Sequence, residues 1–538
     1  MFVRVLATLL ATCLLGCGGG GGSSGSSDPV ATPVTISGTL TFASVPASGT
    51  VGAGLDFSAT VAKAIRGADV QLVSANGAVL ATATSGDMGQ YMLTAPADTD
   101  VRVQVLARLQ GNSGGSWHFA VTDNTNGNAL YALQGALVNS GSVNSSRNLH
   151  ALSGWDGAAY TQPRAAAPFA MLDVVYDAIQ LVLQILPGTD LAPAELRWSI
   201  DNRTVAGLLA DGDIGSTAYY RGANAIYVLG AADVDTDEYD RPVIAHEWAH
   251  YFVDTLSQED SLGGAHRPGD QLDMRVAFSE GLTNALSAAI LGDALYRDSN
   301  GLSQAAEFNF DIDENVVANP GWFSEASVHA LLHDLFGVQI ISGGAPLTGL
   351  QATLEMLTSQ PYIDMLEFTS IHSFAAQLKA RESGFTSAVD ALAAMQGIVL
   401  VDGRGTGETN EPSNDPVNFP LLPLYQPITI GLSSDPVCSV NDHGVYNKQG
   451  IHRFLVLQIF TTRTYLVSIN RKSGMVNSTP ALNIWHDKVI IDSVVGAPQM
   501  NNAFWIGQLT PGFYILDVFE DENATVGLGD VCFEVDVN

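Results

Sequence analysis

Two histidines and a glutamate lie close together near the middle of the chain, in the stretch RPVIAHEWAHYFVD. His246 and His250 are four residues apart, so on a helix their side chains lie one above the other on the same face. That spacing suits two imidazoles that share one metal ion, and zinc is the expected cofactor. Glu247 lies one position round the helix, where it can reach a water molecule as general base.

A catalytic zinc site needs a third protein ligand and one open position. The stretch MRVAFSEGLTNALSAAILG predicts a second amphipathic helix, on which Glu280 and Asn284 are one turn apart. Glu280 is therefore the favoured third ligand. The alternatives lie in the preceding loop: His266, Asp260, Asp270 and Asp273.

The pair HEWAHYFVD and SEGLTN resembles the gluzincin metallopeptidases, and among them the thermolysin-like group. The resemblance implies that Glu280 is the third ligand and that Asn284 orients His246 from behind. Asp254 falls where the thermolysin-like pattern has an aspartate, so the resemblance implies that it too supports a metal ligand from behind. The stretch that starts at Asn224 and Ala225 resembles the edge strand along which such enzymes bind substrate backbone.

Two departures from that pattern are visible in the region of resemblance, which covers about 225–334. The gap between His250 and Glu280 is longer than usual, which predicts an inserted loop over 258–273. Asn284 replaces a charged group. Metzincins are excluded, because the position of their third histidine is occupied by Leu256.

A group that stabilises the oxyanion of the transition state should face the metal from a later element. The stretch GWFSEASVHALLHDLFG offers His329 and His333, and Glu325 followed by Val328 and His329 resembles the thermolysin-like arrangement. The alternative is that both histidines are ordinary core or surface residues. His329 is the residue we assign to this role.

Acidic residues dominate the charge, with 55 Asp and Glu against 23 Lys and Arg. This balance argues against a nucleic-acid partner or binding to an anionic membrane surface. One acidic run could bind Ca²⁺, although a solvated loop explains it as well. It comprises Asp233, Asp235, Asp237, Glu238 and Asp240.

The first seventeen residues predict a signal peptide, and the ending Leu-Leu-Gly before Cys17 resembles a lipobox. Cys17 is then lipidated, and Gly18 after it favours the outer membrane of the cell envelope. An ordinary secretory signal is the alternative. The Gly/Ser-rich residues 18–33 predict a flexible tether. Of the remaining cysteines, Cys438 and Cys532 are expected to form a disulfide in an exported chain.

The expected fold is multi-domain, with a β-sandwich on each side of an α-rich α+β zincin-type domain. Alternating, turn-rich residues 34–160 predict an accessory β-sandwich, and helical spacing over 161–400 predicts the zinc metallopeptidase domain. Residues 401–427 read as a linker. Residues 428–538 predict a second β-sandwich, and its LTPGFYILDV turn resembles pre-peptidase C-terminal domains.

These features together predict a lipid-anchored zinc metallopeptidase, most simply an endopeptidase acting on peptide or protein substrates. Glu247 would be its general base. Two alternatives stay open: a catalytically silent surface binding scaffold with a zinc site, and a zinc amidase that acts on the cell wall.

Overall fold

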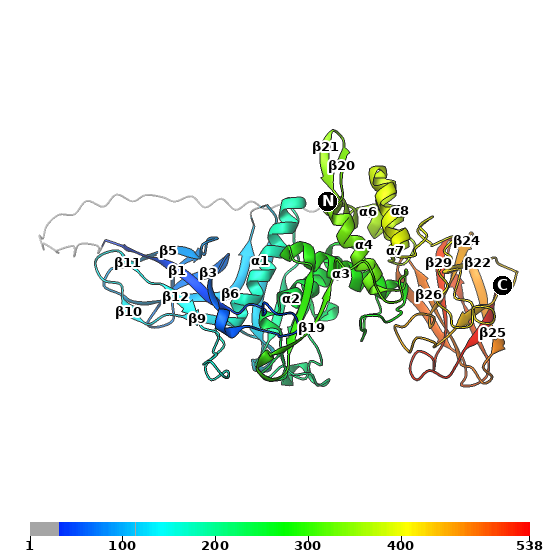
Figure 1. Cartoon of the computed structure of the whole chain (residues 1–538), viewed down its shortest axis with the longest axis horizontal. Helices are drawn as coiled ribbons and strands as arrows, with labels where there is room; N and C mark the ends of the chain where they lie inside the picture. Colours follow the sequence, from blue (N-terminus) through cyan, green and yellow to red (C-terminus); the bar gives the residue numbers. More distant parts are fainter. Residues whose placement is uncertain (1–31, 113) are drawn as a thin grey trace, which may run out of the picture.

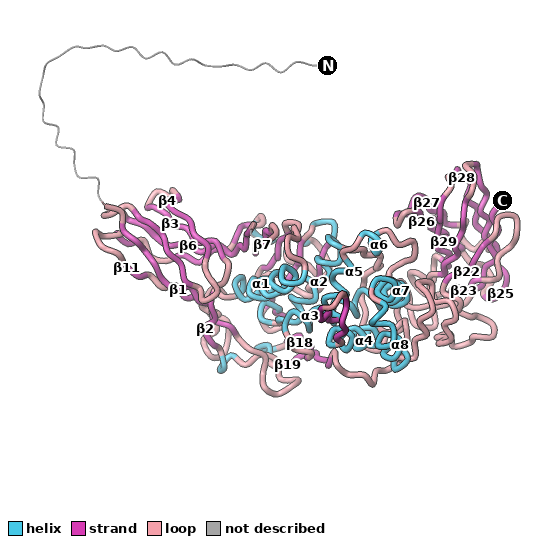
Figure 2. The backbone as a smooth tube through the Cα atoms, turned by 90° about the horizontal axis from the view of Figure 1, so that it is seen from above, coloured by secondary structure: helices cyan, strands magenta, loops and turns pink. Residues whose placement is uncertain are grey.

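The computed structural model describes residues 32–112 and 114–538. The predicted signal peptide, Cys17 and nearly all of the predicted tether lie outside the described residues. Within the described part, strands occupy both ends of a long molecule and helices occupy its middle (Figure 1). The view from above shows the same order, with the helices grouped between two regions of strands (Figure 2).

The N-terminal strands form a five-stranded sheet centred on β1, which pairs with all four others. Along β1 the side chains of Val34, Ile36, Leu40 and Phe42 are buried. This period of two turns one face of the strand to the core. The strands are β1 (Val34–Ser44), β2 (Val61–Ala64), β5 (Gln90–Ala95), β11 (Ser145–Ser146) and β12 (Leu149–Ala151).

A ten-stranded sheet continues from this region into the helical region and crosses the boundary expected at residue 160. The two parts join where β7 and β13 run parallel, with Val121 opposite Leu196. A strand edge left unpaired inside a protein would bury N–H and C=O groups without partners, so β7 needs a neighbour. The main path is β14 (Ala218–Tyr220), β15 (Ala225–Val228), β13 (Ala194–Trp198), β7 (Trp117–Asp123), β6 (Asp100–Gly111), β3 (Ala68–Ser74) and β4 (Val79–Thr84), with β8 (Ala129–Leu130), β9 (Ala132–Gln134) and β10 (Val138–Asn139) attached.

The strand predicted at Ala225 is present as β15, but it is not the edge of the sheet. It pairs in parallel with β13 on one side and antiparallel with β14 on the other. All four of its residues are buried, as a strand paired on both sides requires. The outer strand is β14, whose three residues carry no strong strand pattern. The prediction that the edge strand starts at Ala225 is therefore wrong, because the edge strand is β14, the neighbour of β15.

Eight helices lie in the described residues, and all of them fall in the stretch 161–400 whose spacing predicts helices. α2 starts with a proline next to its first residue, and the side chain of Asp273 caps the start of α3. The helices are α1 (Ala167–Ile185), α2 (Arg241–Leu256), α3 (Met274–Leu291), α4 (Glu325–Gly337), α5 (Gly349–Leu357), α6 (Gln360–Ile363), α7 (Ile371–Arg381) and α8 (Thr386–Met395).

Short strands in the helical region form two small sheets. One is a four-stranded sheet whose main hairpin pairs β18 with β19 and places Tyr296 opposite Phe310. The other is a single hairpin. The strands are β16 (Gly230–Ala231), β17 (Asp235–Thr236), β18 (Leu295–Asn300), β19 (Ala306–Asp311), β20 (Gln339–Ser342) and β21 (Ala345–Thr348).

Helix α1 is the only helix in residues 32–112 and 114–538 that is long and apolar enough to cross a membrane. In its most apolar window 61% of the residues are buried inside the molecule. Phe169, Leu172, Val175, Ile179 and Val182, which set its predicted apolar stripe, are all buried. Packing inside the protein therefore accounts for the apolar character of α1.

The C-terminal region is a β-sandwich with its own hydrophobic core. It begins at Tyr425 rather than at the expected residue 428. One sheet runs β22 (Tyr425–Ile428), β24 (Arg453–Ile459), β29 (Gly512–Glu520), β26 (Pro480–His486) and β27 (Val489–Val495). The other runs β23 (Val437–Ser439), β30 (Val531–Val537), β25 (Arg463–Gly474) and β28 (Asn502–Leu509).

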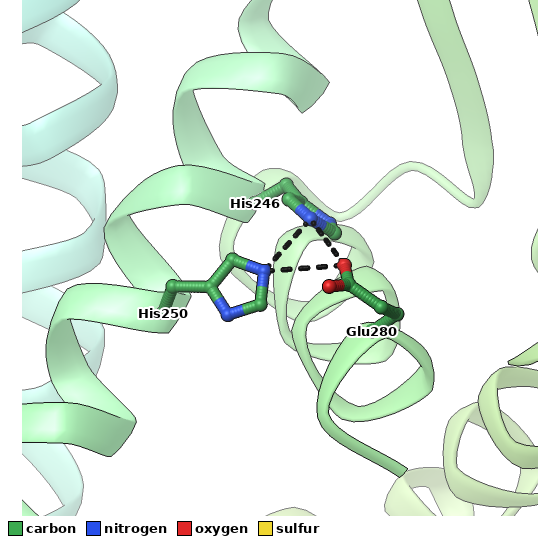
Figure 3. A group of neighbouring side chains, drawn as sticks. All are labelled: His246, His250 and Glu280. Carbon is green, nitrogen blue, oxygen red and sulfur yellow. Dashed lines mark hydrogen bonds and ion pairs between the residues drawn. The ribbon is translucent and has the colours of Figure 1, made fainter. Parts of the chain in front are cut away.

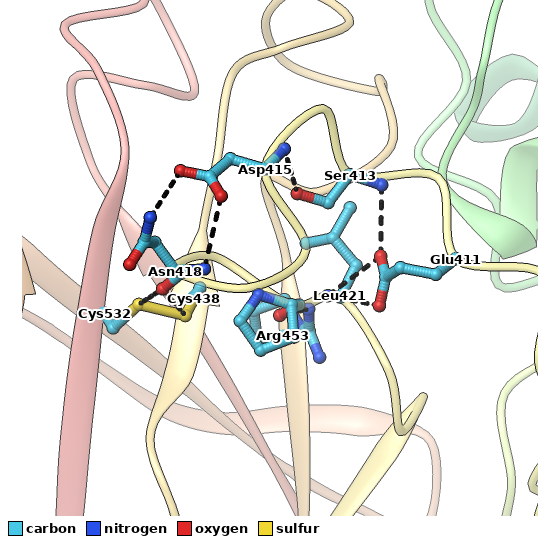
Figure 4. The surroundings of a disulfide bond; sticks show 9 residues. Glu411, Ser413, Asp415, Asn418, Leu421, Cys438, Arg453 and Cys532 are labelled. Carbon is cyan, nitrogen blue, oxygen red and sulfur yellow. Dashed lines mark hydrogen bonds between the residues drawn. A yellow bond between two sulfur atoms is a disulfide. The ribbon is translucent and has the colours of Figure 1, made fainter.

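The predicted disulfide is present and joins neighbouring strands of this sandwich. Cys438 in β23 lies directly opposite Cys532 in β30. The preceding segment folds over the bond, where Asn418 and Asp415 hydrogen-bond to each other (Figure 4). The same segment is fixed by Glu411, which accepts from the backbone N–H of Leu421 at 2.9 Å. The expected linker is thus an ordered part of the sandwich border.

Helix α3 packs between α2 and α4, and a glycine makes its close contact with α4 possible. A Cβ atom added to Gly281 would lie 2.6 Å from Cβ of Val328 on α4. The side chain of Val328 cannot move away, because it is completely buried. The closeness of these two helices therefore depends on the missing side chain at Gly281.

We predict that Gly281→Ala lowers the free energy of unfolding by about 1–3 kcal/mol, because the new methyl group overpacks the α3–α4 contact. Urea unfolding followed by tryptophan fluorescence measures this change. Gly337→Ala is the matched control, since a Cβ at the end of α4 meets nothing within 4 Å. An equal loss in both variants would contradict the argument.

Candidate metal centre

The two histidines of the HEWAH stretch lie on one face of α2 and point at the same place. The Nε2 atoms of His246 and His250 are 3.1 Å apart. Their rings pack edge to face, with centroids 4.8 Å apart. This is the arrangement that the four-residue spacing predicts for one helical face.

Glu280 on α3 completes a group of three ligand atoms (Figure 3). Its Oε2 lies 3.3 Å from Nε2 of His246 and 3.2 Å from Nε2 of His250. A tetrahedral site with bonds of about 2 Å has ligand-to-ligand edges of about 3.3 Å. The three side chains therefore fit a metal ion, and they could hold one.

Because Glu280 is buried, its negative charge has to be balanced by a positive charge close by. Burial alone would raise the pKa of Glu280, but His250 and His266 hold the pKa well below its ordinary value. Burial alone would lower the pKa of His250, yet the Glu280 carboxylate raises it to about 9. A metal cation would satisfy the same carboxylate without protonating the imidazole.

Asn284 and Glu325 form a second layer behind His246. Because an amide oxygen can only accept, His246 Nδ1–H donates to Asn284 Oδ1 at 2.8 Å. Asn284 Nδ2 in turn donates to Glu325 Oε1 on α4 at 2.7 Å. The structure thus brings Asn284 to the position that the resemblance implied. Glu325 was not predicted here, and only its place at the start of α4 against α3 reveals it.

Glu247 is close to the three ligands but turned toward the edge strand. Its Oε2 accepts a hydrogen bond from the backbone N–H of Tyr219 in β14 at 2.7 Å. Burial raises the pKa of Glu247, although His246 and His250 oppose that rise. The carboxylate therefore lies between the candidate metal group and the outer strand of the ten-stranded sheet.

These side chains open onto a cleft of about 940 Å³. Its walls come from β14, α2, α3, the β18–β19 hairpin and the start of α4. Residues 259 and 261–268 of the loop before α3 form another wall. Tyr296 and Phe310 supply aromatic surface beside the metal group, and Asp298 lies at the same wall.

Asp254 lines the cleft, but it does not contact the three ligand side chains. Its Oδ2 accepts from the hydroxyl of Tyr219 at 2.7 Å, and its Oδ1 pairs with Arg221 Nε at 2.6 Å. Asp254 therefore connects α2 to the edge strand. Its expected position next to a metal ligand is not seen.

His329 does not line the cleft. His329 is 4% exposed, and its ring stacks on Phe310 with the two ring centroids 5.4 Å apart. Burial lowers its pKa to about 3, so it stays neutral. His333 pairs instead with Asp313. The helical pattern around these residues predicts a core position equally well, and the structure has that position.

His266 reaches the cleft from the loop over 258–273, which has no helix or strand, as predicted. Its Nε2 lies 3.6 Å from Glu280 Oε2 and 3.5 Å from Glu325 Oε2. The other loop candidates turn elsewhere. Asp260 binds Gln258 and the Thr369 backbone, Asp270 pairs with Lys448, and Asp273 pairs with Arg275.

A second group of carboxylates lies beside the cleft. Asp235, Asp237 and Asp298 place ligand atoms within 4.8 Å of one another, so they could hold a metal ion. Burial raises the pKa of Asp298 to about 7. The other members of the predicted acidic run leave this group: Glu238 pairs with Arg164, Asp240 binds Ser299, and Asp233 caps a turn.

Comparison with known proteins adds little. No family model matches the chain, and no curated protein matches it. Among solved structures, a pre-peptidase C-terminal domain of a Bacillus anthracis collagenase matches at 14% identity over 21% of this chain and 94% of that one, with a TM-score of 0.17. A periplasmic inhibitor of g-type lysozyme, PliG from Aeromonas hydrophila, matches at 14% identity over 21% and 94%, with a TM-score of 0.15. A family 35 carbohydrate-binding module from Clostridium thermocellum matches at 12% identity over 19% and 89%, with a TM-score of 0.13. Scores this low carry no argument about fold or function.

If the three side chains hold a metal ion, Asn284→Ala is predicted to weaken its binding, measured with Zn²⁺ as the probe, about 10- to 100-fold, because His246 loses the acceptor that fixes its ring. Competition with a chromophoric chelator measures the affinity. Ser287→Ala on the same helix is the control, because Ser287 is buried and its hydroxyl has no partner. Unchanged affinity in Asn284→Ala would show that the ring needs no support from behind.

Proposed function

We propose that this protein is a zinc metallopeptidase that hydrolyses peptide bonds in the cleft beside α2. The observation that carries the proposal is the convergence of His246, His250 and Glu280 next to a buried Glu247 at an open cleft. A purely structural metal site has no need for a fourth side chain, the acidic Glu247, at this place.

Zinc suits the donor set better than the hard cations do. Two imidazole nitrogens and one carboxylate oxygen form the usual protein ligand set of catalytic zinc, with one position left open. When bound there, zinc would polarise the scissile carbonyl and make a water molecule more acidic. The remaining steps are performed by side chains and backbone groups of the chain itself.

The outer strand β14 offers a surface for an extended substrate. It lines the cleft and has a sheet neighbour on one side only. A peptide can add to such an edge through main-chain hydrogen bonds. We assign to β14 the substrate-binding role that the sequence suggested for β15, since β15 has neighbours on both sides.

Glu247 is the proposed general base. It takes a proton from the attacking water and delivers it to the nitrogen of the leaving amine, so the proton count balances when the peptide bond breaks. Its hydrogen bond to Tyr219 N–H holds the carboxylate between the substrate strand and the metal ligands. Burial also favours proton uptake by this group.

His266 is the proposed donor to the oxygen that becomes negative during attack. Oxyanion stabilisation needs a donor that faces the reacting carbonyl. His266 lines the cleft next to Glu280, whereas His329 is buried behind Phe310. Nδ1 of His266 donates to Gly264 O at 3.2 Å, so Nε2 can donate into the cleft only when the ring is protonated. Burial alone would lower the pKa of His266, but the Glu280 and Glu325 carboxylates raise it and so favour this imidazolium form.

We predict that Glu247→Gln lowers the rate of peptide cleavage about a hundredfold to ten-thousandfold, because the general base is lost. The assay uses a mixed peptide library and protein that begins at Asp28, with zinc content measured for each sample. Glu314→Gln, an exposed loop substitution of the same chemistry, should cleave like the parent.

The same assay separates the two rival functions. A zinc-loaded parent that cleaves cell-wall fragments but no peptides would identify an amidase. A zinc-loaded parent that cleaves neither would identify a binding scaffold. In both cases the peptidase proposal would fail.

We further propose that Asp235, Asp237 and Asp298 hold a calcium ion. One carboxylate oxygen on each of them is buried without a hydrogen-bond partner, and Asp237 is only 2% exposed. Clustered carboxylate oxygens are the ligands that calcium prefers. Asp237 also accepts from Thr217, which precedes β14, so such an ion would steady the approach to the edge strand.

Calcium at about a hundred times its dissociation constant would stabilise the fold by about 2.7 kcal/mol and raise Tm by roughly 5 °C. Differential scanning calorimetry with and without calcium measures this shift. We expect Asp298→Asn to abolish it. The exposed Asp233→Asn should keep it, and a shift that survives in Asp298→Asn would place calcium elsewhere.

Location is part of the proposal as well. Lipidation at Cys17 would attach the protein to the envelope, most simply to the outer membrane, and the acidic surface would keep the rest of the chain off anionic lipid.

A further inference from the structure

The loop over residues 258–273, here called the active-site loop, rests on the C-terminal β-sandwich. The contact is made by Tyr446–Gln449, here called the clamp segment, which lies in the connection between β23 and β24. This connection leaves β23 just after Cys438, whose disulfide ties it to β30. Its two ends are held together where Val440 N–H donates to Gly450 O at 2.9 Å.

Side chains of the clamp segment donate hydrogen bonds to three carbonyl groups of the active-site loop. The Tyr446 hydroxyl donates to Leu262 O at 2.8 Å, and Asn447 Nδ2 donates to Gly263 O at 2.8 Å. Lys448 Nζ donates to Ala265 O at 2.8 Å. Ala265 immediately precedes His266, so the last of these bonds fixes the residue next to the proposed oxyanion donor.

Backbone contacts extend the clamp to the start of α3. Gln449 N–H donates to Gln271 O at 2.9 Å, and Asp273 N–H donates to Asn447 O at 2.9 Å. Asp273 is the residue whose side chain caps α3. The C-terminal sandwich therefore holds both ends of the peptide that carries His266.

A glycine in the loop allows this approach. Gly264 has φ of +93°, and a Cβ at this position would lie 2.6 Å from the ring of Tyr446. Asn447 is 1% exposed, so its hydrogen bonds are shielded from water. A hydrogen bond away from water is electrostatically stronger than one in water. The active-site loop and the clamp segment therefore form a specific, closely packed interface.

We propose that the clamp segment is a positioning element of the catalytic site, which holds His266 in the cleft without taking part in metal binding. The proposal rests on the peptidase function proposed above. It follows from a division of labour in the fold: the metal ligands come from α2 and α3, while His266 depends on a loop that has no helix or strand of its own. The C-terminal sandwich is then required for turnover.

Two conservative substitutions in the full chain test this. Tyr446→Phe with Lys448→Met removes two of the carbonyl contacts but keeps the packing of both side chains. Because a catalytic group displaced by about 1 Å can cost a hundredfold, we expect kcat to fall about tenfold to a hundredfold, with KM nearly unchanged. Zinc affinity should equal that of the parent. Lys472→Ala, on the same sandwich at an exposed ion pair with Glu534, is the matched control.

A double-mutant cycle shows whether the clamp acts through His266. In a His266→Ala background the clamp substitutions should have no further effect on kcat, because the group that they position is gone. Replacing Lys448 by Arg instead of Met keeps a hydrogen-bond donor at this position. The variant Tyr446→Phe with Lys448→Arg should therefore regain part of the activity that is lost in Tyr446→Phe with Lys448→Met. A clamp variant with the kcat of the parent would overturn the proposal, as would a loss of equal size in the His266→Ala background.

Hydrogen exchange separates this proposal from the proposed function. Amides of residues 262–270 should exchange faster in the clamp variant, whatever the protein hydrolyses. If the parent cleaves no peptide, the peptidase proposal fails, and slow exchange in the clamp variant would show separately that the clamp holds nothing. If the parent cleaves and exchange is unaltered, the clamp proposal alone fails.

Discussion

The buried carboxylate of Glu280 is the constraint on which the rest of the site depends. Its Oε2 lies within 3.2–3.6 Å of three imidazole nitrogens, so it requires positive charge from protons or from a metal ion. A charge buried this deeply is expensive unless it is paired. That requirement fixes the spacing of α2 and α3, since neither helix can move without leaving the carboxylate unpaired. The glycine beside it, Gly281, then lets α4 close over α3.

The charge balance continues outward from the ligands. Asn284 cannot carry a charge, yet it passes a hydrogen bond from His246 to Glu325, which supplies one on α4. Glu325 also lies 3.5 Å from His266. The departure from the expected charged residue at Asn284 is therefore met by an acidic residue one layer further away. The sequence around Asn284 does not show this compensation, because the partner, Glu325, lies on another helix.

Local pattern explains which expectations were met. Helical spacing places His246 and His250 on one face of a helix and Glu280 and Asn284 on one face of another, and the period of two along β1 and the C-terminal strands follows from one-sided burial. The place of Asn284 behind His246 was implied only by the resemblance to the thermolysin-like pattern. The predictions that were wrong concern features that depend on contacts between residues far apart in the sequence. The order of β14 and β15 is set by pairing with β13, which no local pattern encodes. The sequence neighbours of His329 and of His266 are both compatible with the role of oxyanion donor. Only the packing of Phe310 on His329 distinguishes the two residues.

The site is assembled from parts of the chain that lie far apart in sequence, and this limits what can be detached. β14 reaches the cleft as the last strand of a sheet that begins with N-terminal strands, so the N-terminal region supports the strand that we propose as the substrate edge. The clamp segment reaches it from the C-terminal sandwich. Only the ligands on α2 and α3 are local to the central helices. The metal binding and the substrate positioning that we propose would therefore make different demands on the fold, and the second would involve the N-terminal, central and C-terminal regions together.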